Sequence, residues 1–83
     1  MTAKRIPISA EALRALVNSE LASLVPCKGV EAARIEVLPK PDLRGCNWRI
    51  GAFVHGQPPE PCNGLAAIAI WSLQWRYCVR EDD

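Results

Sequence analysis

The last long helical segment of the chain, Asn63 to Val79, is apolar on two sides, and this feature constrains the fold more than any other part of the sequence. A helix that only covers a core has one apolar stripe and one polar stripe. Here two sets of apolar residues recur at helical spacing on nearly opposite faces. The first set is Ala66, Ile70, Leu73 and Tyr77, and the second set is Ile68, Trp71, Trp75 and Cys78. Two apolar faces predict two packing partners.

The length of the chain limits its core. Its 83 residues are expected to form one small domain over residues 1–83, with residues 1–7 and 81–83 flexible. Such a domain buries only about 60% of the surface of its unfolded chain, so its core needs a cross-link or a partner. Hydrophobic residues make up 49% of the sequence and charged residues 23%, which is close to the globular average. The composition therefore predicts a folded body.

Two observations bear on location. The longest apolar run, Leu65 to Trp71, is far shorter than the ~20 residues that span a membrane. The N-terminal segment has no apolar run of the length that a secretory signal needs. We therefore expect a cytoplasmic protein without a membrane segment.

The charges are balanced and mixed along the chain. Ten basic and nine acidic residues give a net charge of +1, whereas nucleic-acid binding requires basic residues gathered on one face. No catalytic, metal-binding or nucleotide-binding motif stands out. These observations predict a non-enzymatic protein without a cofactor or a metal ion.

The first half of the chain predicts a helix followed by a strand. Apolar residues recur at three- and four-residue steps from Ser9 to about Val25, with Ser9 as the N-cap. Pro26 ends this helix, and Lys28 with Gly29 forms the turn. Alternation then predicts a half-buried strand over residues 33–38, with Ala33, Ile35 and Val37 facing inward.

A second strand is predicted over residues 47–55, with Trp48, Ile50, Ala52 and Val54 facing inward. The two strands are expected to form an antiparallel hairpin. If Ile35 lies opposite Ile50, then Glu36 faces Arg49 on the outer side. A proline-rich loop leads into the last helix, where Pro59 or Pro61 takes the first position or Asn63 forms the cap.

The order helix, strand, strand, helix predicts a two-layer α+β fold (αββα) with both helices on one face of the hairpin. A two-stranded sheet is at the limit of independent stability. Two hairpins that pair edge to edge across a two-fold axis would form a four-stranded sheet and let the spare side of the last helix pack on its counterpart. In the alternative, the first helix covers that side within the monomer. We favour the homodimer.

The four cysteines, Cys27, Cys46, Cys62 and Cys78, lack the close pairs that are typical of zinc sites. Cys62 and Cys78 cannot bond to each other, because one helix would hold them about 24 Å apart. If the thiols are oxidised, the predicted topology allows the pairs Cys27–Cys62 and Cys46–Cys78 only. In a cytoplasm the thiols would stay reduced, as small buried apolar side chains.

A thiol-dependent enzyme or redox protein centred on Cys62 is one alternative function. Cys62 lies near a helix N-terminus, where the helix dipole favours the thiolate, and His55 precedes it by a short loop. No third residue that would orient the imidazole can be named. The segment Gly45 to Trp48 also resembles a motif, because glycine and asparagine suit a turn that enters a strand, but it suggests no chemistry.

The tryptophans of the last helix indicate an interface. Trp71 and Trp75 lie four residues apart beside Arg76, and clusters of aromatic residues with arginine are typical of interaction hot spots. We expect Ile68, Trp71, Trp75 and Arg76 to contact a second copy of the chain or another protein. The alternative partner is single-stranded nucleic acid, with Trp71 and Trp75 stacking on bases. Its basic residues would be Arg44, Arg49, Arg76 and Arg80.

Overall fold

Strands β2 (Ala32–Val37) and β3 (Trp48–Phe53) form an antiparallel hairpin in the computed structural model, which describes residues 5–43 and 45–80. The predicted register is confirmed, since Ile35 lies opposite Ile50 and Glu36 lies opposite Arg49. The Arg49 guanidinium donates a hydrogen bond to the Glu36 carboxylate across the two strands. The strand pairing that the predicted fold class assumes is therefore confirmed.

The inward-facing residues of the hairpin differ from the prediction at both ends, and Val37 and Val54, which were predicted to face inward, are 47% and 37% exposed. The register shifts between Ala32 and Arg34 and again between Arg34 and Ile35, and such irregularities break the two-residue alternation. As a result Ala32 is fully buried, whereas Ala33, which was predicted to face inward, is exposed. Phe53 packs against the core although alternation predicted it to face outward.

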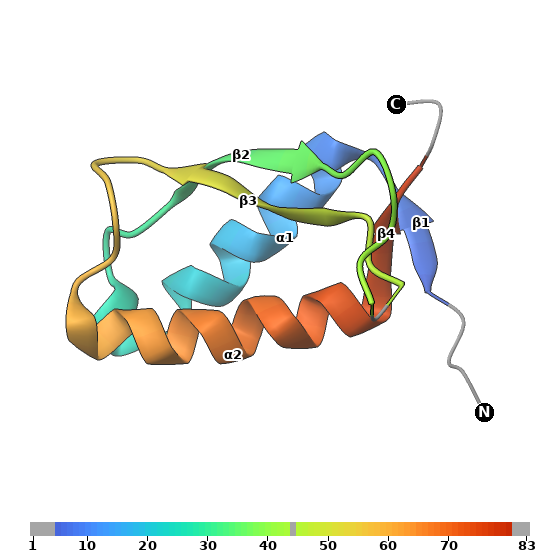
Figure 1. The fold of residues 1–83 in the computed structure, drawn as a ribbon. Coiled ribbons are helices and arrows are strands. Elements are labelled where there is room, and N and C mark those ends of the chain that lie inside the picture. Colours follow the sequence, from blue (N-terminus) through green and yellow to red (C-terminus); the bar gives the residue numbers. More distant parts are fainter. Residues whose placement is uncertain (1–4, 44, 81–83) are drawn as a thin grey trace.

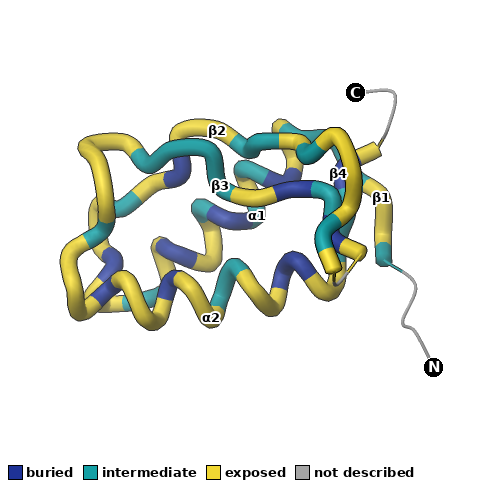
Figure 2. The backbone as a smooth tube through the Cα atoms, in the orientation of Figure 1, coloured by how far each residue is buried: buried dark blue, intermediate teal, exposed yellow. Residues whose placement is uncertain are grey.

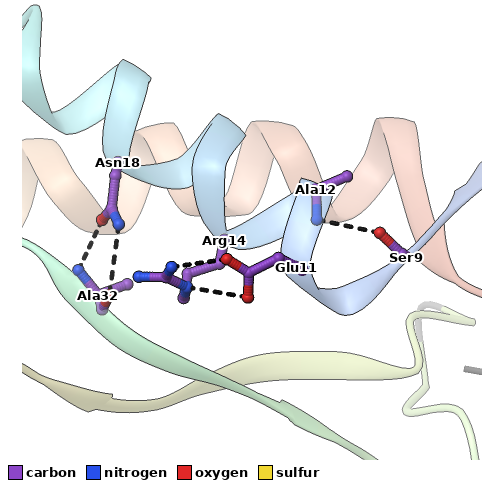
Figure 3. Close-up of polar contacts among 6 residues, drawn as sticks. All are labelled: Ser9, Glu11, Ala12, Arg14, Asn18 and Ala32. Carbon is purple, nitrogen blue, oxygen red and sulfur yellow. Dashed lines mark hydrogen bonds and ion pairs between the residues drawn. The ribbon is translucent and has the colours of Figure 1, made fainter.

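Helix α1 (Ala10–Ala22) begins at the predicted cap and ends earlier than predicted. The amide of Ala12 donates a hydrogen bond of 3.1 Å to the Ser9 hydroxyl oxygen, as Figure 3 shows. The helix stops at Ala22, and Pro26 instead lies in a 3₁₀ helix, η1 (Val25–Cys27). Gly29 then turns the chain with a φ of 85°, a conformation that glycine adopts without steric cost.

Helix α2 (Glu60–Arg76) begins and ends three residues before the predicted limits, and strand β4 (Tyr77–Val79) follows it directly. Pro59 is the N-cap residue and Pro61 is the second residue of the helix. The prediction that Tyr77 and Cys78 continue the two helical faces is wrong, because both residues are extended. The backbone dihedrals of Tyr77 (φ −130°, ψ 152°) mark this change.

Strand β1 (Ile6–Ile8) pairs with β4 in parallel, and neither strand is predicted by the sequence patterns. Ile6 lies opposite Tyr77 and Ile8 opposite Val79. Ile6 and Pro7, which were expected to be flexible, therefore form part of a strand pair, while residues 1–4 and 81–83 lie outside the described residues. The pairing brings the first and last described elements side by side at one end of the molecule (Figure 1).

Both helices lie on the same side of the hairpin, with α1 against β2 and α2 in the layer farther away (Figure 1). Figure 2 marks buried residues along both helices and in the hairpin, and these residues form one core cluster. The core consists of Leu13, Val17, Leu21, Cys27, Ala32, Cys46, Trp48, Cys62, Ala66, Leu73 and Val79.

The segment Gly45 to Trp48 joins the hairpin to the end of α2 and to β4. The Asn47 side-chain amide donates to the carbonyl of Val79 at 2.9 Å, and its oxygen accepts from the Val79 amide at 3.0 Å. The Trp48 indole donates to the carbonyl of Tyr77 at 3.0 Å. The Gln74 amide in turn donates to the carbonyl of Trp48 at 3.1 Å. This segment therefore has a structural role.

Within the described residues, no helix has the length and apolar character needed to cross a membrane.

Candidate interaction site on helix α2

The side of α2 that faces away from the core carries a continuous apolar stripe, which we call the outer face. Leu65, Ile68, Trp71 and Trp75 follow one another at three- and four-residue steps, and residues at this spacing are neighbours on a helix surface. Their side chains are between 40% and 67% exposed. The buried residues of the same helix, Cys62, Ala66 and Leu73, lie on its opposite side.

The two tryptophans contact each other. Their ring centroids lie 6.0 Å apart with an interplanar angle of 89°, an edge-to-face arrangement that aromatic pairs prefer. The Arg5 guanidinium lies 5.2 Å from the centroid of Trp75, within the range of a cation–π contact. Its Nε also donates a hydrogen bond of 2.7 Å to the carbonyl of Gln74. Arg5 therefore borders the outer face at its C-terminal end.

Helix α1 does not cover the outer face. Its buried residues, Leu13, Val17 and Leu21, belong to the same core as Ala66 and Leu73. Trp71 remains 52% exposed and Ile68 remains 67% exposed. The explanation in which α1 packs against the spare side of the last helix is therefore wrong for this chain.

The other predicted interface residue, Arg76, lies at the margin of the outer face. It follows Trp75 by one residue, and successive residues are about 100° apart around a helix. Its guanidinium lies 5.4 Å from the centroid of the Tyr77 ring. Sequence reasoning missed Leu65 and Arg5. Leu65 could have been found, because it lies three residues before Ile68.

The arginines predicted for nucleic-acid binding are not all near the tryptophans. Arg49 lies on β3 and pairs with Glu36, and the hairpin forms the layer opposite α2 (Figure 1). Arg76 and Arg80 are exposed and follow the end of the outer face. Arg44 lies outside the described residues. Among the described arginines, Arg5, Arg76 and Arg80 therefore lie near the C-terminal end of the outer face.

The predicted thiol site has no thiol at its centre. The sulfur of Cys62 is bonded to that of Cys27 at 2.10 Å, and both residues are fully buried. His55 is exposed in the turn after β3, with a φ of 67°. A nucleophilic role for Cys62 with His55 as its base is incompatible with this arrangement.

The second pairing allowed by the predicted topology, Cys46 with Cys78, is not formed. The Cys46 thiol is buried and donates to the carbonyl of Trp48 at 3.3 Å. Cys78 was predicted on a helix, but it lies in β4, where its neighbours Tyr77 and Val79 both pack against the core. Because side chains alternate along a strand, Cys78 points to the other face of β4.

Among residues 5–43 and 45–80, no three histidine, cysteine or acidic side chains are grouped so that they could bind a metal ion. Comparison of the chain with protein-family models, with curated proteins and with solved structures finds no match.

Proposed function

We propose that this protein is a small non-enzymatic interaction domain that binds a second copy of itself through the outer face of α2. The observation that supports this proposal is the stripe of Leu65, Ile68, Trp71 and Trp75, in which every side chain is at least 40% exposed. Contiguous apolar patches on a protein surface mark interaction sites, and tryptophan is enriched among the residues that dominate binding energy.

The outer face suits a second copy because it is self-complementary. Two α2 helices that cross antiparallel at Ile68 would place Leu65 of each copy against Trp71 of the other. Glu60 in the first turn and Arg76 in the last turn carry opposite charges at the two ends of the helix. The same antiparallel arrangement brings these opposite charges together at both ends of the contact. Such a two-fold arrangement is the commonest form of oligomer.

The proposal concerns the domain with its disulfide formed. The sequence favours a cytoplasmic location, where thiols are kept reduced, whereas disulfides persist in oxidising compartments. A cytoplasmic location is therefore compatible with the proposal only if the buried Cys27–Cys62 bond resists reduction.

The test is the molar mass in solution, measured by light scattering and by analytical ultracentrifugation over a micromolar concentration range. We expect the wild-type chain to be a dimer and the double variant Ile68→Glu, Trp71→Glu to be a monomer, since four buried charges would oppose the contact. Val25→Glu is the matched control, because Val25 is an apolar residue that is 86% exposed outside the outer face. It should remain dimeric. A wild-type chain that is monomeric at every concentration would refute the homodimer.

Single-stranded nucleic-acid binding is the second candidate, because Arg5 and Arg76 border the exposed tryptophans. Base stacking on tryptophan would quench its fluorescence, and the binding would weaken steeply with salt. Trp75→Leu should then lower the affinity for a fluorescent oligothymidine by a larger factor than it changes the molar mass of the protein in solution. A lack of binding at low salt would exclude this candidate.

A further inference from the structure

Side chains cover several strand edges of this small fold. The Asn18 side chain on α1 accepts from the amide of Ala32 at 2.7 Å and donates to its carbonyl at 3.3 Å, which occupies the outer edge of β2 at Ala32 (Figure 3). Asn47 binds Val79 in the same two-bond manner and covers the edge of β4 that faces away from β1.

The outer edge of β1 is blocked by proline. The amide of Arg80 donates to the carbonyl of Ile8, so the main chain of Ile8 faces β4 and that of Pro7 faces away. Proline lacks an N–H group, and its presence on an edge prevents pairing with another strand. Within the described residues, Pro7 and Asn47 therefore restrict strand addition at the outer edges of β1 and β4.

The edge of β3 around Ile50 is different. Main-chain groups of an antiparallel pair point alternately toward the partner strand and away from it. The Leu38 amide donates to the carbonyl of Asn47, and Glu36 pairs with Arg49, so the alternation directs the N–H and C=O groups of Ile50 away from β2. Within the described residues, no group outside the hairpin makes a hydrogen bond to the main chain of Ile50.

This edge opens into a groove of about 380 Å³ between β3 and the start of α2. The volume lies within the ~300–1,000 Å³ range of ligand pockets. Its wall consists of Ile50, Gly51, Ala52, Phe53, Gly56, Gln57, Pro58 and Asn63. Four of these residues are apolar, Ile50, Ala52, Phe53 and Pro58, and Gln57 and Asn63 are polar. Asn63 is about 120° around α2 from the outer face, so the groove is a separate surface.

We propose that this groove binds an extended peptide segment of another protein, which adds to β3 as a third strand. The N–H and C=O groups of Ile50, which are directed away from β2 beside this groove, match the main chain of an extended peptide, and this pairing supplies affinity in strand-addition complexes. The apolar wall selects peptides with uncharged side chains at the residues that face it.

The first test is amide hydrogen exchange of the isolated protein, followed by NMR. The amide of Ile50 should exchange faster than that of Arg49, which faces β2, although the two residues are adjacent. Addition of a capped heptapeptide of alternating valine and threonine should slow the exchange of Ile50 and leave that of Arg49 unchanged. An Ile50 amide that is as protected as that of Arg49 before the peptide is added would overturn the proposal.

The second test uses variants at Asn63, which is exposed and therefore tolerates substitution. Asn63→Trp fills the groove and should weaken binding of the heptapeptide by at least about tenfold, whereas Asn63→Ala should change it less than about threefold. The same peptide with every amide N-methylated should not bind, because it cannot donate to the main chain of Ile50. Binding that survives either Asn63→Trp or N-methylation would contradict strand addition, as would the absence of binding by the unmodified heptapeptide.

The tests separate this proposal from the homodimer. Asn63→Trp should leave the molar mass in solution unchanged, and the double variant Ile68→Glu, Trp71→Glu should leave the peptide affinity unchanged.

Discussion

At the scale of residues, two asparagine side chains make the main-chain hydrogen bonds that a neighbouring strand would otherwise make. A strand edge presents an N–H and a C=O group side by side, and a side-chain amide offers one acceptor and one donor at a matching separation. Asn18 binds the edge at Ala32 and Asn47 binds the edge at Val79 in this way. A single side chain can therefore satisfy the main-chain N–H and C=O groups of one residue at the edge of a two-stranded sheet.

Asn47→Ala tests this role. The substitution removes both hydrogen bonds to β4 and leaves the main chain of the buried residue Val79 without them. We expect the free energy of unfolding to fall by about 1–3 kcal/mol. Urea denaturation followed by circular dichroism measures it, and Asn63→Ala is the control at an exposed asparagine. A loss below about 0.5 kcal/mol, the usual range of surface substitutions, would show that Asn47 is not required.

At the scale of elements, α1 begins with a cap and an ion pair that both lie in its first turns. The Arg14 guanidinium donates to the Glu11 carboxylate at 2.7 Å (Figure 3). The hydrogen bond from Arg14, and then its charge, hold the pKa of Glu11 below its ordinary value. A carboxylate with a lowered pKa stabilises the fold above its unfolded pKa, and this contribution is lost as the pH falls through the folded pKa.

The pH dependence of Glu11→Gln tests this coupling. At neutral pH the wild-type chain should melt at a higher temperature than the variant. The difference should shrink as the pH falls from about 7 to about 3, since the carboxyl of Glu11 then becomes protonated. Thermal unfolding followed by circular dichroism measures both proteins, with Glu20→Gln as the control on the same helix. A difference that is constant over this range would contradict the ion pair.

The sequence predicted those elements whose signals are local. Helix α1 has a cap and a helical period, and the hairpin register follows from its alternation and from the charges of Glu36 and Arg49. Strands β1 and β4 have three residues each, which is too short for a periodic pattern. Tyr77 to Val79 also continue the apolar spacing of α2, so their pattern predicted helix. Their strand conformation depends on Ile6 and Asn47, which are distant in the sequence.

The candidate site was predicted more completely than the groove. The exposure of Trp71 and Trp75 follows from a helix that is apolar on opposite sides, which is a local property. The groove exists because the start of α2 leaves the edge of β3 at Ile50 uncovered. No residue spacing in the sequence encodes that relation, because it depends on how far α2 lies from the hairpin.

At the scale of the whole molecule, long-range links hold a small core together. The Cys27–Cys62 disulfide joins η1 to the first turn of α2 across 35 residues of sequence. The β1–β4 pair joins the two ends of the described chain. The disulfide lies at the start of α2 and the β1–β4 pair directly after its end, so the two links tie distant parts of the chain together at both ends of this helix.

Loss of the disulfide should destabilise the domain strongly. For a loop of this length the chain-entropy model predicts a loss of about 3–4 kcal/mol in the free energy of unfolding. Urea denaturation with and without dithiothreitol measures it for the wild-type chain. The double variant Cys27→Ala, Cys62→Ala should be equally unstable in both conditions, while Cys78→Ala should respond to dithiothreitol like the wild type. If reduction left the wild-type midpoint unchanged, the disulfide would not contribute to stability.

The parallel pairing of β1 with β4 has a consequence for synthesis on the ribosome. Translation proceeds from the N-terminus, so β1 is synthesised well before β4, the strand with which it pairs within the described residues. Until β4 has been synthesised, Ile6 and Ile8 cannot form this pairing. The described domain can therefore complete its fold only after β4 has left the ribosome.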